Sequence, residues 1–140
     1  MKKKSLNFII KHGTYPFDIM VSLGESIDEL EKRLKFTNIS ESEVKEEMDL
    51  MRGCKTTQGR TIMFSTNQTV LWLRYMPSTP IDFSHLQHEI FHSVDFMLSK
   101  IGIKLSRDSD EAYAYQIQYV TEKIYFEIFK HTLKGKGKKK

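Results

Sequence analysis

The hydrophobic pattern of this 140-residue chain changes its period at Pro80, and that change constrains the fold more than any other feature. Before Pro80, apolar residues come in short runs rich in β-branched and aromatic side chains, which is typical of strands. After Pro80 they recur at spacings of three and four residues, the period of an amphipathic helix. This combination of strands and helices predicts an α+β domain.

Capping and turn residues divide the first part of the chain. Ser26 with Glu29, and Ser40 with Glu43, form capping-box patterns that open two short helices. Asn67 lies between two β-like runs that we interpret as a hairpin. The expected elements are strands at 5–10 and 17–23, helices at 26–35 and 40–51, strands at 61–65 and 69–75, and helices at 80–102 and 109–130.

Length and composition limit the classes of protein. One domain covering residues 1–133 is expected, because 39% hydrophobic residues can bury a core of moderate size. No apolar run approaches the roughly 20 residues of a membrane span, so no membrane partner is expected. Cys54 is the only cysteine, which excludes an internal disulfide and favours the cytoplasm.

The net charge of +4 comes from the two ends of the chain. Three lysines lie at 2–4 and five in the segment 134–140, whose glycines and like charges predict a disordered tail. Without these lysines, 14 basic residues face 18 acidic ones. A mildly acidic body does not favour specific nucleic-acid binding.

The sequence His-Glu-Ile-Phe-His at 88–92 is the strongest chemical signal. His88 and His92 lie one helical turn apart and can chelate one metal ion, for which imidazole nitrogens favour zinc. Glu89 would act as general base on an attacking water. Projected on a helix, both histidines fall opposite the apolar stripe of 83–101, so they are free of the core.

A catalytic zinc needs a third protein ligand, and we expect it on the next helix. Glu111 follows His92 after 18 residues and lies in the first turn of that helix, where it can point back at the metal. Asp95 lies beside the metal face as an outer partner for a ligating imidazole. His85 is more simply read as an exposed bystander and Trp72 as a core residue.

These motifs carry a family resemblance that covers about residues 69–130. HExxH followed by 18 residues and a glutamate resembles the gluzincin branch of zinc metallopeptidases. The stretch at 110–114, Asp-Glu-Ala-Tyr-Ala, is similar to the Asn-Glu-Gly-Phe-Ala signature of zinc aminopeptidases. The strand, proline break, HExxH and Glu-Ala-Tyr-Ala-Tyr helix are together similar to small HExxH proteins encoded by bacteriophages.

The resemblance implies a small zincin-like domain that hydrolyses peptide bonds. It implies a short mixed or antiparallel sheet, with 69–75 as the edge strand that pairs with an extended substrate. One zinc per chain would be held by His88, His92 and Glu111, with Glu89 as the base.

Two departures from the family leave alternatives open. The aminopeptidases are several times larger and carry an upstream amine-recognition motif that this chain lacks. The sequence offers no obvious downstream histidine to stabilise the tetrahedral intermediate, which leaves Tyr113, Tyr115 and Tyr119 as candidates. A chain of 140 residues can form only thin walls around a substrate cleft, which favours a partner chain, a homo-oligomer or a narrow substrate. The alternative function is a non-catalytic or vestigial zinc-containing module of a larger assembly, such as a phage particle.

Overall fold

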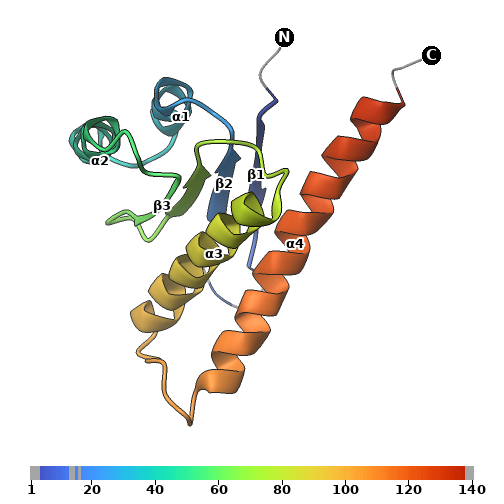
Figure 1. The fold of residues 1–140 in the computed structure, drawn as a ribbon. Coiled ribbons are helices and arrows are strands. Elements are labelled where there is room, and N and C mark those ends of the chain that lie inside the picture. The colour runs from blue at the N-terminus through green and yellow to red at the C-terminus, as the bar shows by residue number, and fades with distance from the viewer. Residues whose placement is uncertain (1–3, 13–14, 16, 138–140) are drawn as a thin grey trace.

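The computed structural model describes residues 4–12, 15 and 17–137, and it has the α+β architecture expected from the sequence (Figure 1). The elements are β1 (Leu6–Ile10), β2 (Ile19–Leu23), α1 (Ile27–Leu34), α2 (Glu41–Gly53), β3 (Gly59–Met63), β4 (Thr69–Leu73), α3 (Pro80–Lys100) and α4 (Asp110–Lys136).

The four strands form one mixed sheet in the order β1-β2-β4-β3. β1 pairs antiparallel with β2, β2 pairs parallel with β4, and β3 pairs antiparallel with β4. The β3–β4 hairpin predicted around Asn67 is confirmed, and Asn67 takes a φ of 65° in its turn. The turn predicted between β1 and β2 lies partly outside the described residues.

The prediction that 69–75 forms the edge strand is wrong, because β2 pairs with the open side of β4 and places it inside the sheet. All five residues of β4 are buried, since helices cover both faces of the sheet there. Both sets of alternating side chains in β4 are therefore buried. The edge strand before the HExxH helix is β3, most of whose residues are half-buried.

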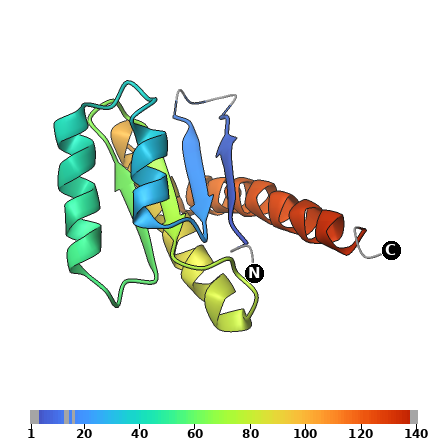
Figure 2. The same cartoon turned by 90° about the horizontal axis from the view of Figure 1, so that it is seen from above.

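Helices cover the sheet on both faces (Figure 2). α1 and α2 close one face over an apolar cluster that contains Trp72, as predicted. α3 lies across β3 and β4 on the other face, and α4 contacts α3 and β1. The second core cluster fills the space between these two helices and the sheet.

Side-chain caps fix where the helices α1, α2 and α3 begin. Ser26 and Glu29 form the predicted capping box of α1. Ser40 caps α2, but the Glu43 carboxylate binds the amide and hydroxyl of Ser65 on the β3–β4 turn. Thr79 and Asp82 form a capping box before α3, with proline in the first turn.

The last helix is longer than predicted, because it continues through Lys136. Residues 134–136 of the predicted disordered tail are therefore helical, and 138–140 lie outside the described residues. In the described part of the chain, none of the helices is both long and apolar enough to cross a bilayer.

A candidate metal centre on helix α3

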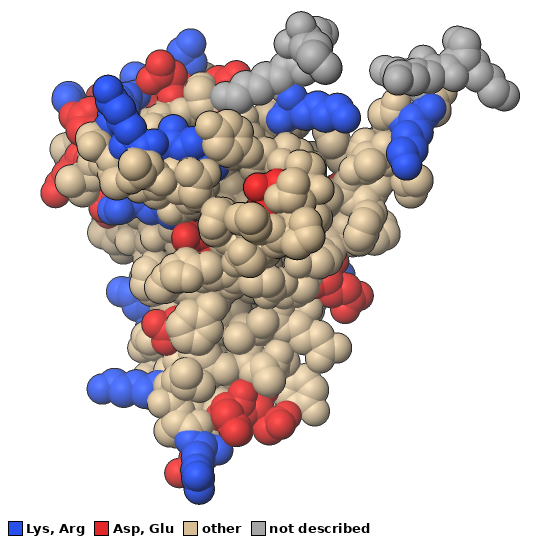
Figure 3. All heavy atoms as spheres, viewed as in Figure 1, with Lys and Arg blue, Asp and Glu red and all other residues tan. Residues whose placement is uncertain are grey.

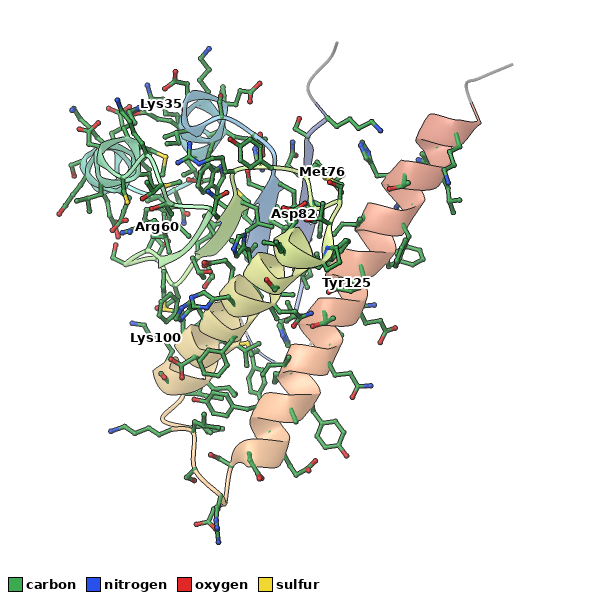
Figure 4. The ribbon with its side chains drawn as sticks, viewed as in Figure 1. Lys35, Arg60, Met76, Asp82, Lys100 and Tyr125 are labelled. Atoms are coloured by element: carbon green, nitrogen blue, oxygen red, sulfur yellow. The ribbon has the colours of Figure 1, made fainter. Side chains whose placement is uncertain are left out.

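The HExxH motif occupies the middle of α3, between the first turn marked by Asp82 and the last turn marked by Lys100 (Figure 4). His88 is exposed and His92 is half-buried, which confirms that neither lies on the buried stripe of the helix. The side chains that α3 buries are Leu86, Glu89, Ile90, Ser93, Val94, Met97 and Leu98.

The two imidazoles are already arranged as a pair. The Nε2 atoms of His88 and His92 are 3.1 Å apart, and the rings meet edge to face at an interplanar angle of 77°. Two nitrogens on one tetrahedral zinc are about 3.3 Å apart, given Zn–N distances of about 2.0–2.1 Å. The pair therefore presents two nitrogens at a spacing that suits a single zinc ion.

Glu89 is turned from the histidine face toward the sheet, where it is 7% exposed. Its Oε2 accepts a hydrogen bond of 2.6 Å from the Thr61 hydroxyl on β3. The same hydroxyl lies 3.1 Å from the Glu89 carbonyl oxygen. The carboxylate is therefore fixed between the HExxH helix and the edge strand.

Gly59 makes room for this carboxylate. A Cβ at Gly59 would lie 2.9 Å from Glu89 Cγ, 3.2 Å from Glu89 Oε1 and 2.7 Å from Leu73 Cδ2. Gly59 and Thr61 are two residues apart on β3, so both face the helix. Sequence reasoning missed both residues, although a glycine at the start of a strand often marks a close approach of another group.

No charged partner neutralises Glu89 within the part of the chain that the structure describes, where its carboxylate forms no ion pair. Buried carboxylates in proteins are usually paired with a cation or bound to a metal. A metal ion beside the two histidines would supply the missing positive charge.

Glu111 is exposed in the first turn of α4. Among the described residues, no three or more His, Cys, Asp or Glu side chains are placed together to hold a metal ion. The structure thus brings together His88 and His92 but not Glu111. The antiparallel register explains this, because Tyr113 lies level with Asp95 and leaves Glu111 further toward the C-terminal end of α3.

Asp95 is held by the second helix. Its Oδ1 accepts a hydrogen bond of 2.8 Å from the Tyr113 hydroxyl, and burial together with this carboxylate raises the pKa of Tyr113. Tyr115 is 66% exposed, and the Tyr119 hydroxyl donates to the Lys11 carbonyl at 3.2 Å. None of these three tyrosines has a hydrogen bond to the paired histidines in the described structure.

The remaining histidines lie apart from the pair. His12 is half-buried between the rings of Tyr15 and Tyr119, and this burial lowers its pKa. His85 is half-buried on α3, and His131 lies toward the end of α4.

Comparisons of this chain with models of known protein families, with curated proteins and with solved structures found no match. The fold and the site by themselves define an α+β protein in which a helix with an HExxH motif packs against the edge of a mixed sheet and presents two neighbouring histidines.

Proposed function

We propose that this protein is a zinc-dependent hydrolase of peptide bonds with a zincin-like arrangement of sheet and helices. One observation carries the proposal. The Nε2 atoms of His88 and His92 lie 3.1 Å apart, and the residue next to His88 in the sequence, Glu89, is buried and hydrogen-bonded to the edge strand β3. A purely structural metal site has no need of a carboxylate at that position.

His88 and His92 would hold the zinc, and their nitrogen spacing fits that ion. Glu111 remains the predicted third ligand, and its use requires the first turn of α4 to move toward the histidine pair. The connecting segment 101–109 is mostly exposed, but the movement would also have to accommodate the buried Tyr113, whose hydroxyl donates to Asp95 and to the Ile103 carbonyl. When bound, zinc would polarise the scissile carbonyl and make a water molecule more acidic.

Glu89 would take the proton from the attacking water and pass it to the leaving amine. The Thr61 hydroxyl binds Oε2 and leaves Oε1, on the Gly59 side, for that proton. The hydrogen bond also fixes the carboxylate rotamer against β3, which reduces the conformational freedom of the base.

The open side of β3 offers a place for the substrate. Among the strands that the structure describes, β3 pairs with β4 alone, so one row of its backbone amides and carbonyls is not used in the sheet. An extended peptide can add to such an edge as a further strand. This would bring its backbone beside the strand that also holds Glu89.

The test is hydrolysis of a fluorogenic peptide library by the zinc-loaded full chain. We expect Glu89→Gln to keep its zinc and lose about 10²–10⁴-fold of the rate, as for the loss of a general base. Glu46→Gln, at an exposed position on α2, is the matched control and should keep full activity. Full activity in Glu89→Gln would refute the mechanism.

A non-catalytic zinc module is the second candidate, and the grouping of only two metal-binding side chains among the described residues favours it. In that case zinc would raise the melting temperature of the protein, because it binds the folded state alone. Wild type would then show this stabilisation without cleaving any member of the library.

A further inference from the structure

The C-terminal part of α4 extends beyond the helix that supports it. Tyr125 contacts the first half of α3: its ring lies 5.3 Å from that of Phe83, and its hydroxyl accepts a hydrogen bond of 3.2 Å from Gln87 (Figure 4). Residues 126–136 continue past the start of α3 (Figures 1 and 2). An open groove of about 1180 Å³ separates this end from the segment 75–78.

This projecting end carries a stripe of exposed apolar side chains. Phe126, Phe129 and Leu133 are 62%, 59% and 68% exposed, and they follow one another at spacings of three and four residues. The same spacing continues to Glu122 on one side and to Lys136 on the other. A repeat of three and four is the seam of a two-stranded coiled coil.

The stripe is complementary to itself in one orientation. Glu122 and Lys136 form no ion pair with any residue that the structure describes. If two copies run antiparallel with their apolar blocks in contact, the Glu122 end of each lies beside the Lys136 end of the other. A parallel pair would place like charges together at both ends.

We propose that a second copy of this chain docks antiparallel on the stripe formed by Phe126, Phe129 and Leu133, with Glu122 and Lys136 pairing across the interface. The contact is isologous, so two chains close it and no further copies add. The inference does not depend on zinc or hydrolysis, because it uses a different part of α4 from the metal centre. The space-filling view shows basic side chains at this end of the molecule, consistent with a terminal positive charge (Figure 3).

The first test is the mass of the full chain by sedimentation velocity over a range of micromolar concentrations. We expect wild type to approach twice 16.5 kDa as the concentration rises. Phe126→Glu and Phe129→Glu should each give monomer while keeping the wild-type circular dichroism spectrum, because both positions are exposed. Leu105→Glu, an exposed apolar position in the α3–α4 connection, is the matched control and should still dimerise.

Charge reversal tests the orientation. Glu122→Lys alone and Lys136→Glu alone should each weaken the dimer at least tenfold, and the double variant should restore it. Monomer at every concentration, or a dimer that Phe129→Glu leaves intact, would overturn the interface. Failure of the double variant to recover would overturn the antiparallel pairing.

Discussion

Two buried glutamates lie on opposite faces of the sheet, and they differ in the groups that bind their carboxylates. Glu25 is 5% exposed and Glu89 is 7% exposed. Glu25 lies at the end of β2 beside α1, whereas Glu89 belongs to α3 on the other face. Burial is therefore the same, and the difference lies in the partners.

Glu25 has a full set of partners. The Arg33 guanidinium binds both of its oxygens, at 2.5 and 3.2 Å, and the Ser22 hydroxyl donates at 2.7 Å. Its carbonyl oxygen accepts a hydrogen bond of 3.0 Å from the Trp72 indole. A buried carboxylate with a bidentate arginine is a structural element that joins α1 to the sheet.

Glu89 accepts from a single hydroxyl, that of Thr61, and its position on the helix adjoins His88. Burying a carboxylate without a cation costs stability. Retaining such a group makes physical sense where a bound cation or a reacting proton uses it. The partners of a buried carboxylate, and not its degree of burial, thus distinguish a structural role from a chemical one.

The largest effect on stability is expected from removing the Glu25 charge. Glu25→Gln should lower the free energy of unfolding by about 2–3 kcal/mol, because it leaves the guanidinium of Arg33, which is 26% exposed, without a counter-charge. Glu89→Gln should change that energy by less than about 1 kcal/mol, since no cation loses its partner. Urea unfolding of both variants measures the difference, and equal losses would remove the distinction.

The next largest loss of stability is expected for Gly59→Ala. The added Cβ would lie under 3.0 Å from Leu73 Cδ2 and Glu89 Cγ, so the variant should lose about 1–3 kcal/mol by overpacking. Gly53→Ala is the control, since nothing lies within 4 Å of a Cβ at that helical position. Gly53→Ala should raise the free energy of unfolding by about 0.5–1 kcal/mol. A stable Gly59→Ala with normal urea unfolding would show that Glu89 is not confined by β3.

A smaller change in the free energy of unfolding is expected from substitutions of Thr61. Thr61→Val removes the donor to Glu89 and should cost about 1 kcal/mol, whereas Thr61→Ser keeps a hydroxyl there. If Thr61 positions the base, the valine variant should also lose hydrolysis rate while the serine variant keeps most of it. Rates that fall equally in both variants would point to packing as the cause.

The smallest change in stability is expected for the half-buried His12, which lacks a hydrogen-bond partner at one ring nitrogen within the described structure. Its Nε2 is buried without a hydrogen-bond partner among the described residues, and burial lowers the pKa of the ring despite the opposing charge of Asp18. The unfolded chain then binds a proton more readily than the folded one. Stability should fall by less than about 1 kcal/mol as the pH drops through the ordinary histidine value of 6.5, and His12→Gln should flatten this part of the pH profile. An unchanged profile in that variant would contradict the assignment.

Much of the fold follows from local signals in the sequence. The predicted capping residues Ser26 and Ser40 and the change of period at Pro80 correspond to the observed starts of α1, α2 and α3. Strand order is not local, which is why β4 was expected at an edge that β3 occupies. The helical structure of residues 134–136 was not predicted, because a short segment of glycines and lysines favours disorder when it is considered by itself.

In the candidate site, too, some features follow from local sequence and others depend on how distant segments pack. The pairing of His88 with His92 follows from a spacing of four residues on one helix. The burial of Glu89 against Gly59 and Thr61 depends on which strand α3 crosses, and no local pattern encodes that crossing. Spacing alone likewise cannot fix the register between α3 and α4, on which the distance of Glu111 from the histidines depends.

Zinc binding by the full chain tests the central claim most directly. Elemental analysis after zinc loading and removal of free metal should give about one zinc per chain for the wild type and for His85→Ala, the control on the same helix. His88→Ala and His92→Ala should retain almost none. A wild type without zinc after loading, or a His92→Ala variant that keeps as much as the wild type, would contradict a metal centre on α3.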